Sequence, residues 1–313
     1  MATRRLIAAL DIGASSVKAG IVDPASGELL KYMDEVAFDT SNPEAFAAAI
    51  PDAIRSLTGG LDNFTLTGLG ISMCALCKDG IVVEAPNLQW FGIPFVELVA
   101  AALRKGTLSM PVAMENDGDC FTLGEWRYGV AKGCHDVLGI TLGTGIGGGF
   151  VVKGRVFRGG MGFSIEPGHT KVNYTLDTPT CGCGARFCLE AGAGAAGIIH
   201  TYQLKGGEVD ETTTVEDIHQ RAEAGEEIAQ KLFIRIGRRL GVGLAGLCNI
   251  FNPQALVIGG GVSRARKYLE PSLCSALEGE TLVSIRGKSV LLWSELMNKA
   301  NLLGAAAIVE GGG

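Results

Sequence analysis

Two segments of this 313-residue chain share one pattern, and the repeat constrains the fold more than any other feature. "LDIGASSVKAGIVD" (residues 10–23) and "ITLGTGIGGGFVVK" (residues 140–153) align without gaps at an offset of 130 residues. Each reads as an apolar strand, a glycine-containing turn and a second apolar strand. Similarity at this spacing indicates an internal duplication at the scale of a domain. The sequence therefore predicts two related halves.

Strand patterns alternate with helix patterns in the rest of the chain. "PEAFAAAIPDAIRSL" and "FVELVAAALRKG" read as helices, the second with a stop at Gly106, whereas "LTGLGISMC" and "PVAME" read as short buried strands. A longer helix ends before Pro253 and is followed by a strand at residues 255–258. One face of that helix carries an apolar residue at every fourth position: Ile228, Leu232, Ile236, Leu240 and Leu244. This alternation predicts an α/β fold with crossover connections.

Composition and charge limit the classes of protein that remain. With 47% hydrophobic residues, 313 residues are too many for one ordinary core, so two domains are expected. The net charge of −6 argues against nucleic acid or an anionic membrane as the main partner. The apolar run after the first basic residues ends at Asp11, too early for a signal peptide, and the uncharged run of residues 240–262 is broken by Pro253 and glycines. We expect a cytoplasmic protein.

Glycine-rich turns in both repeats are candidate phosphate sites. Asp11 stands two positions before Gly13, and Thr141 stands two positions before Gly143. A tight turn with little side-chain bulk exposes backbone N–H groups, which form a concavity suited to phosphate. "GTGIGGG" alone is also compatible with a plain turn, and the duplicate favours the phosphate site. Three further glycines follow the strand at 255–258 and would let a flat ligand approach the backbone: Gly259, Gly260 and Gly261.

The stretch "MENDGD" places an amide and carboxylates directly after the strand "PVAM". The carboxyl ends of parallel strands usually face a ligand crevice. Asp117, with Asn116 beside it, could hold a hydroxyl group and accept its proton, provided that the electrophile is strongly activated. The alternative on local sequence is that Asp117 caps the helix that follows.

Nine cysteines are an odd number in a chain without an export signal, so metal ligation or burial is favoured over disulfides. Three of them form a Cys3His set, which contains the ligand types of a closed structural zinc site: His169, Cys181, Cys183 and Cys188. Such a metal would shape the loop so that Glu166 and Glu190 face one pocket, where two carboxylates could bind sugar hydroxyls. Buried metal-free cysteines and two solvated surface glutamates are the alternatives.

Over nearly its whole length the chain resembles sugar kinases of the ROK group, within the actin-like ATPase superfamily. The motifs that carry the resemblance are "LDIGASSVKAGIVD", "APNLQW", "END", "LGTGIGGGFV", "EPGH", "CGCGARFCLE", "NPQALVIGGGV" and "LLGAAAI". The resemblance implies an α/β fold of two actin-like (ribonuclease H-like) domains with a ligand cleft between them. The smaller N-terminal domain would span residues 1–117, joined by a C-terminal helix at about 300–313, and the larger one, with the zinc loop, residues 118–299.

The resemblance also implies roles for individual residues. Asp117 matches the catalytic base that takes the proton from the sugar hydroxyl, usually the one on carbon six. The sugar-binding positions match Asn116, Glu166, His169 and Glu190, with His169 also a zinc ligand. Asp11 would hold Mg²⁺ beside Gly13 in the first phosphate turn. The second phosphate turn matches Gly143, Thr144, Gly145 and Gly147, and Gly259, Gly260 and Gly261 match the adenosine edge of the ATP site.

Three stretches depart from the family pattern. The first turn, commonly Asp-x-Gly-Gly-Thr-Lys, reads "DIGASS", so that Ala14 replaces a glycine and Ser16 the lysine; strand alternation puts Lys18 on the same face as residue 16. The segment "GISMCALCKDG" lacks the usual proline in a loop that shapes the sugar pocket in the family. Phe187 occupies a position that is usually glycine, where it would bend the metal loop or narrow the pocket.

The motifs and the resemblance predict an ATP-dependent hexose kinase with glucokinase-like activity. The resemblance alone implies a homodimer. A kinase for another hexose or N-acetylhexosamine, such as N-acetylmannosamine, N-acetylglucosamine, allose or fructose, is the alternative within the class. A sugar-binding relative without catalysis is a second alternative, motivated by "DIGASS". A sugar-responsive repressor is disfavoured, because the phosphate turn begins at Asp11 without room for a DNA-binding domain before it, and because the chain is acidic.

Overall fold

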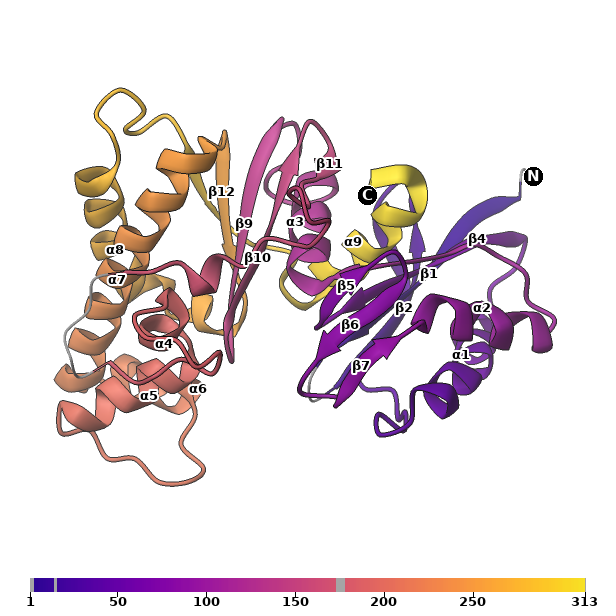
Figure 1. The fold of residues 1–313 in the computed structure, drawn as a ribbon, viewed down its shortest axis with the longest axis horizontal. Coiled ribbons are helices and arrows are strands. Elements are labelled where there is room, and N and C mark those ends of the chain that lie inside the picture. Colours follow the sequence, from indigo (N-terminus) through magenta and orange to yellow (C-terminus); the bar gives the residue numbers. More distant parts are fainter. Residues whose placement is uncertain (1–2, 14–15, 173–177, 313) are drawn as a thin grey trace. The chain divides into compact units, whose positions relative to one another are not determined.

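The computed structural model describes residues 3–13, 16–172 and 178–312. The chain packs into two compact units (Figure 1). Unit 1 comprises Met1–Gly139, Gly149–Ile165 and Glu295–Gly313, and unit 2 comprises Ile140–Gly148 and Glu166–Ser294. The boundary expected between residues 117 and 118 differs from the division between these units, and it stays a prediction about the two actin-like halves.

Unit 1 is built on a five-stranded sheet in the order β3-β2-β1-β4-β8. The first hairpin predicted from the repeat is present, because β1 pairs antiparallel with β2; β1 also pairs parallel with β4, which pairs parallel with β8. Ala14, one of the departures in the first turn, lies outside the described residues. The strands are β1 (Arg4–Ile12), β2 (Val17–Asp23), β3 (Glu28–Met33), β4 (Phe64–Met73) and β8 (Val112–Asn116).

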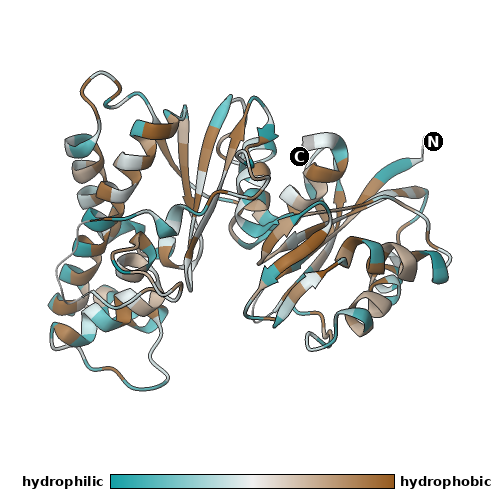
Figure 2. Cartoon of the chain, viewed as in Figure 1, coloured by the Kyte–Doolittle hydropathy of each residue, from teal (hydrophilic) through white to brown (hydrophobic). Residues whose placement is uncertain are grey.

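Helices cover both faces of this sheet, which explains the continuous apolar run of β1. Leu6 and Leu10 pack in one cluster with Phe46 of α1 (Pro43–Thr58), and α2 (Phe95–Lys105) lies on the same face. Ile7 and Ala9, which alternate with them, pack in a second cluster with α3 (Asp117–Arg127) and α9 (Ala300–Ala307). Figure 2 shows apolar residues recurring along the strands.

Local signals explain the ends of the first two helices. Asn42 caps α1, where its side chain accepts a hydrogen bond of 2.8 Å from the backbone N–H of Ala45. Gly106 ends α2, as the sequence predicts. Between the two helices the chain runs through β4 and then through a small antiparallel sheet in which Trp90 is buried. This sheet is formed by β5 (Leu76–Lys78), β6 (Ile81–Ala85) and β7 (Trp90–Ile93).

The C-terminal helix α9 packs against β1, β4 and α3 in unit 1. Glycines allow a close approach of α3 and α9: a Cβ on Gly304 would lie 2.8 Å from the Cα of Cys120, and a Cβ on Gly124 would lie 3.2 Å from the Cα of Ala300. No larger residue fits at either position without moving one helix. A short 3-10 turn, η3 (Met297–Lys299), precedes α9, and a short π-helical turn, η4 (Ile308–Gly312), follows it.

The second repeat forms β9 (Asp136–Leu142) and β10 (Ile146–Val152), which each begin in one unit and end in the other. They are neighbours in a five-stranded sheet in the order β11-β10-β9-β12-β13. The remaining strands of this sheet are β11 (Arg155–Val156), β12 (Ala255–Gly259) and β13 (Val290–Trp293). The strand predicted at residues 255–258 is therefore confirmed as β12.

The longest helix of unit 2, α7 (Glu227–Phe251), contributes many buried residues to the core and packs along α8 (Arg266–Glu280). The predicted apolar face of α7 is confirmed: Leu232, Ile236, Leu240 and Leu244 are buried and Ile228 is partly buried. In the described part of the chain, no helix combines the length and apolarity that a membrane span requires. The shorter helical elements of unit 2 are η1 (Pro167–His169), α4 (Leu189–Ala193), α5 (Ala195–Leu204), α6 (Val215–Glu223) and η2 (Gly261–Ala265).

Candidate active site

Asp11 ends up buried at the carboxyl end of β1, where three side chains surround its carboxylate. Its Oδ1 accepts hydrogen bonds from Ser72 Oγ at 2.8 Å and Asn301 Nδ2 at 3.1 Å. The ammonium of Lys18, its partner across the β1–β2 hairpin, lies 3.8 Å from Oδ2. Burial raises the pKa of Asp11, and the hydrogen bond from Ser72 and the charge of Lys18 oppose that rise. Oδ2 of Asp11 is thus the oxygen that faces the ammonium group of Lys18.

Asn116 ends β8 and Asp117 follows it, at the same edge of the sheet. The parallel registers Ile12↔Met73 and Met73↔Asn116 align the ends of β1, β4 and β8. The predicted strand "PVAM" is therefore confirmed, and "END" stands at its carboxyl end together with Asp11.

The capping role considered for Asp117 belongs mainly to its neighbour. Asn116 is the N-cap of α3, and its Oδ1 accepts hydrogen bonds from the N–H groups of Gly118 at 2.8 Å and Asp119 at 3.3 Å. Its Nδ2 donates to the carbonyl of Ala75 at 3.1 Å. Asp117 is the first helical residue and is only partly buried. The amide of Asn116 therefore orients the start of α3 and the carboxylate of Asp117.

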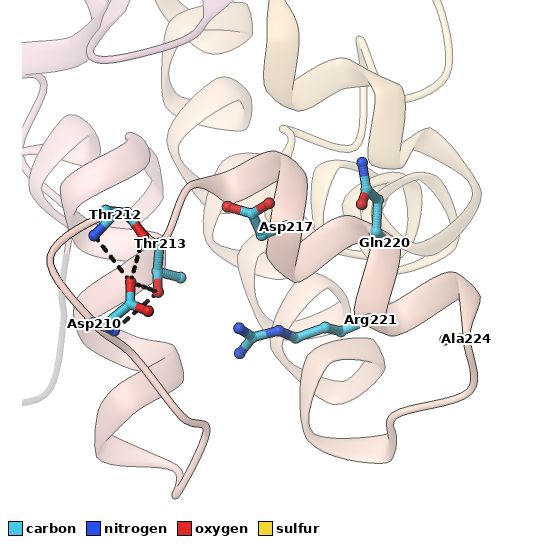
Figure 3. A pocket seen from close by; sticks show the side chains of 7 residues that line it. All are labelled: Asp210, Thr212, Thr213, Asp217, Gln220, Arg221 and Ala224. Atoms are coloured by element: carbon cyan, nitrogen blue, oxygen red, sulfur yellow. Dashed lines mark hydrogen bonds between the residues drawn. The ribbon is translucent and has the colours of Figure 1, made fainter.

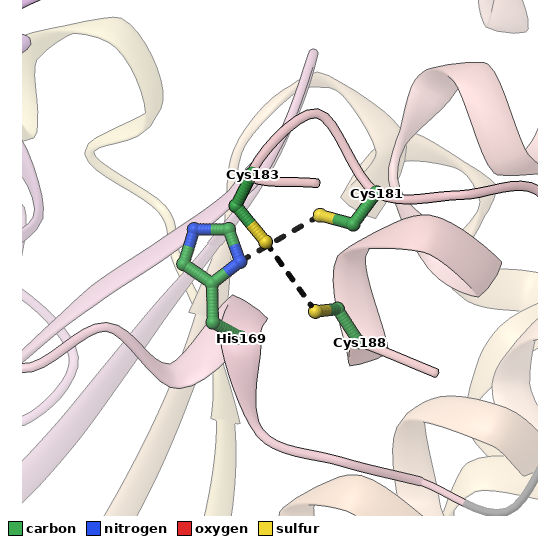
Figure 4. Close-up of side chains that lie close together, drawn as sticks. All are labelled: His169, Cys181, Cys183 and Cys188. Atoms are coloured by element: carbon green, nitrogen blue, oxygen red, sulfur yellow. Dashed lines mark hydrogen bonds between the residues drawn. The ribbon is translucent and has the colours of Figure 1, made fainter. Parts of the chain in front are cut away.

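The Cys3His set comes together within unit 2 (Figure 4). The four candidate ligand atoms all lie within 4.8 Å of one another. Cys181 Sγ is 3.7 Å from His169 Nδ1, and Cys183 Sγ is 3.7 Å from Cys188 Sγ. Tetrahedral zinc with Zn–S bonds near 2.3 Å places its ligand atoms about 3.8 Å apart.

These separations and donor types fit a structural Zn²⁺ ion with four protein ligands. Lys171 Nζ donates a 2.9 Å hydrogen bond to Cys188 Sγ. Residues 173–177, part of the loop that the metal is predicted to shape, lie outside the described residues.

Phe187, within this cluster, has a φ of 64°, in the region that favours glycine. The departure from glycine seen in the sequence therefore coincides with a strained backbone next to Cys188.

Glu166 and Glu190 lie close enough to affect each other. Burial raises the pKa of Glu166, the charge of His169 lowers it and the charge of Glu190 raises it. Glu190 Oε2 accepts a 2.9 Å hydrogen bond from the N–H of Ile146, and its Oε1 lies 3.4 Å from Cys181 Sγ. Glu190 thus connects the second glycine turn to the cysteine cluster.

The second glycine turn is closed by a 2.9 Å hydrogen bond from the N–H of Gly143 to the carbonyl of Gly145. A Cβ on Gly145 would collide with the carboxylate of Glu190, and a Cβ on Gly147 would lie 2.9 Å from the hydroxyl of Thr141. Gly260, at the end of β12, has a φ of 86°, and a Cβ there would collide with Leu142. The glycines at these turns therefore permit backbone approaches that larger residues would block.

A cavity of about 380 Å³ in unit 2 opens beside this turn. Three of the residues predicted to bind the nucleotide line it, namely Gly143, Thr144 and Gly261; Gly145, Gly147, Gly259 and Gly260 are not among its lining residues. The rest of its lining was missed by the sequence analysis, and comes from α5, the start of α6 and the segment after β12: Ala195, Ile199, Thr213, Thr214, Val215, Glu216, His219, Val262, Arg264 and Ala265.

One of these missed segments carries a readable signal. Thr214 and Asp217 form a capping box at the start of α6, a pattern that "TVED" contains. At the rim of the cavity, the carboxylate of Glu216 lies 4.0 Å from His219 Nδ1 and 3.9 Å from Arg264 Nη1.

A second, more open cavity of about 470 Å³ shares Thr213 with the first (Figure 3). Its polar groups bond mainly to neighbouring protein atoms: Asp210 accepts from Thr212 and Thr213, and Arg221 Nη1 donates to the carbonyl of Glu208 at 2.6 Å. None of the predicted nucleotide residues lines it. The smaller cavity is therefore the better candidate for a ligand site.

Comparison with known proteins identifies the family. The model of the ROK family matches residues 7–311. The chain belongs to the ROK family. A glucokinase of Thermotoga maritima is 30% identical over 315 residues, which cover 96% of each chain. A xylose repressor of Bacillus subtilis is 27% identical, over 96% of this chain and 76% of the repressor.

Solved structures of the ROK family agree with the fold. The crystal structure of a ROK family glucokinase from Streptomyces griseus, in complex with glucose and AMPPNP, superposes with a TM-score of 0.77 at 29% identity, and the match covers 98% of this chain and 99% of that one. The predicted family and the α/β fold with two actin-like domains are thus confirmed. The comparisons also support the predicted class of enzyme, an ATP-dependent sugar kinase.

Proposed function

We propose that the protein transfers the γ-phosphoryl group of ATP to a hydroxyl group of a hexose, that on carbon six, with glucokinase-like activity. The observation that carries the proposal is the placement of "END". Asn116 caps α3, so that the carboxylate of Asp117 stands at the carboxyl edge of the parallel strands beside Asp11. The ROK glucokinase relatives supply the reaction class.

Asp117 is the proposed catalytic base. Phosphoryl transfer depends mainly on positioning and electrostatic stabilisation, and a carboxylate can take the hydroxyl proton as the oxygen attacks the phosphorus in line. The capping bonds of Asn116 hold the first turn of α3, so Asp117 starts from a defined backbone position. Glu166, His169 and Glu190, with Asn116, are the proposed sugar-binding residues.

The proposed nucleotide site is the 380 Å³ cavity. Adenosine would lie against Gly261 and the helices that line the cavity, and Gly143 to Gly147 would hold phosphate oxygens through backbone N–H groups. Asp11, whose carboxylate is buried at the carboxyl end of β1, would hold Mg²⁺. When bound, Mg²⁺ neutralises charge on the phosphate oxygens. The Cys3His set would bind zinc in a structural role, with no position left for catalysis.

The test is ADP release by the purified protein with Mg-ATP and a panel of hexoses and N-acetylhexosamines. We expect hexose-dependent release, which the Asp117→Ala variant lowers by a factor on the order of 100 or more while sugar binding persists. Asp52→Ala is the matched control, because Asp52 lies on α1 with 84% of its side chain exposed. Wild-type turnover by Asp117→Ala would assign the base to another residue.

The panel also separates the alternatives. Preference for an N-acetylated or other hexose would change the substrate and keep the reaction. Binding of sugar without any ADP release would favour a non-catalytic relative, a role that the similarity to a xylose repressor keeps open. We further propose a homodimer, and sedimentation that shows only monomer would reject it.

A further inference from the structure

The segment of residues 158–165 precedes Glu166 and forms neither helix nor strand. It contains three glycines, and Gly159 and Gly162 have positive φ values of 57° and 77°. Met161, in the middle, is 73% exposed. A segment of this composition has little order of its own, so the contacts that hold it define where the chain enters Glu166.

Side chains of unit 1 hold this segment at three places. At its start, Arg158 forms an ion pair with Glu115, which is buried at the end of β8. In the middle, Lys78 Nζ donates to the carbonyl of Met161 at 2.9 Å and lies 5.4 Å from the ring centroid of Phe163. At its end, Ser164 Oγ donates to Asp119 Oδ2 at 2.5 Å.

Two of these anchors flank the proposed catalytic base. Glu115 and Asp119 stand two residues before and two residues after Asp117, one in β8 and one in the first turn of α3. The structure that positions Asp117 therefore also holds the segment that leads into Glu166.

Burial of the Asp119 carboxyl group costs more free energy than a purely structural contact requires. Its side chain is fully buried, and Oδ1 has no hydrogen-bond partner among the described residues. An unsatisfied buried polar group costs about 1–3 kcal/mol. The site is also tight, because a Cβ on Gly149 of β10 would lie 2.5 Å from Oδ1. Burial, and then the charge of Glu115, raise the pKa of Asp119, which favours the neutral form beside Asp117.

We propose that Asp119 is a positioning residue for sugar binding, which acts through Ser164 to fix the chain two residues before Glu166. This inference rests on the proposed function. Asp119 itself does not touch the substrate; its hydroxyl partner sets the path of the backbone into the sugar-binding carboxylate. Loss of the contact should therefore weaken the binding of the hexose more than the binding of ATP.

Three single variants and the double variant Ser164→Ala/Asp119→Ala test the contact. Ser164→Ala and Asp119→Ala each remove it, and Asp119→Asn retains a carbonyl oxygen that can accept from Ser164. Ser272→Ala is the matched control, because it removes a 2.7 Å hydroxyl hydrogen bond to the carbonyl of Ile234 between helices of unit 2. Two readouts are needed: hexose and ATP affinities, by KM and by calorimetry, and hydrogen exchange of the peptide at residues 157–168.

We expect Ser164→Ala and Asp119→Ala to raise the hexose KM roughly three- to tenfold, in line with the loss of one hydrogen bond, with the ATP KM changed less than about twofold. Exchange in residues 157–168 should accelerate, the double variant should add nothing to the single ones, and Asp119→Asn should stay near the wild type. Ser272→Ala should change neither readout.

Wild-type hexose affinity in Ser164→Ala and Asp119→Ala would overturn the proposal, as would equal losses of hexose and ATP affinity, which indicate a general loss of structure. If the wild type binds a hexose without phosphorylating it, the proposed kinase activity fails, and the hexose dissociation constant still decides the role of Asp119. If the wild type binds no hexose, both the proposed kinase activity and the proposed role of Asp119 are refuted.

Discussion

The contact between α3 and α9 predicts that one methyl group on Gly304 destabilises the protein. The Gly304→Ala variant would place its Cβ 2.8 Å from the Cα of Cys120 and closer still to the carbonyl group of that residue. Carbon atoms in favourable contact are about 3.5–4.0 Å apart, so α9 must move away by at least about 0.7 Å. Because the obstructing atoms belong to a helix backbone, no side-chain rotation can relieve the clash.

The magnitude follows from two opposing terms. Overpacking of a well-packed core costs about 1–3 kcal/mol, and a clash with backbone belongs at the upper end. Alanine is a better helix former than glycine by about 1 kcal/mol. The net loss of unfolding free energy is therefore about 2 kcal/mol, which lowers the Tm by roughly 4–8 °C in domains of comparable size.

The assay is thermal unfolding of Gly304→Ala beside a matched glycine substitution on another helix. Gly246 lies inside α7, and among the described residues no heavy atom beyond its chain neighbours and the local helix backbone lies within 4 Å of a Cβ placed there. Gly246→Ala therefore keeps the gain in helix propensity without a clash, and should raise the Tm by roughly 2–4 °C. A Gly304→Ala variant as stable as the wild type, or stabilised as much as Gly246→Ala, would refute the close packing of α3 on α9.

Three further predictions concern unit 2. Phe187→Gly should raise the free energy of unfolding by about 1 kcal/mol in denaturant titration, because Phe187 has a φ of 64°; a loss of stability would show that packing of the ring outweighs the strain. The pKa of Glu166 is raised, so its carboxylate is protonated, and lost as a hydrogen-bond acceptor, at a higher pH than that of an exposed glutamate. Hexose affinity should therefore decrease as the pH is lowered through this raised pKa. Glu166→Gln should abolish the pH dependence, and an unchanged pH profile in that variant would assign the dependence to another group. Elemental analysis should find about one zinc per chain, and removal by a chelator should lower the Tm; a metal-free protein with unchanged Tm and activity would reject the site.

Much of the fold could be predicted because its signals are local. The duplicated strand–turn–strand pattern, the apolar stripe of α7 and the stop at Gly106 each depend on residues that are close in sequence, and the structure bears them out. The pairing of Lys18 with Asp11 is also local, since strand alternation and a hairpin bring the two side chains to one face. The N-cap of α3 was harder to predict, because Asn and Asp are both good capping residues. The structure shows that the cap is Asn116 and not Asp117.

The chain's own order of residues thus determines its class, its repeats and the ligand types near the site. The "END" motif, the glycine turns and the Cys3His set could be found in the sequence because the proposed catalysis, phosphate binding and zinc binding need particular residue types at short spacings. Only the tertiary structure decides which distant groups meet them. Asn301 reaches Asp11 across 290 positions and Ser164 reaches Asp119 across 45, because side-chain contacts depend on how strands and helices pack, and hydrophobic periodicity specifies which face is buried without specifying the partner.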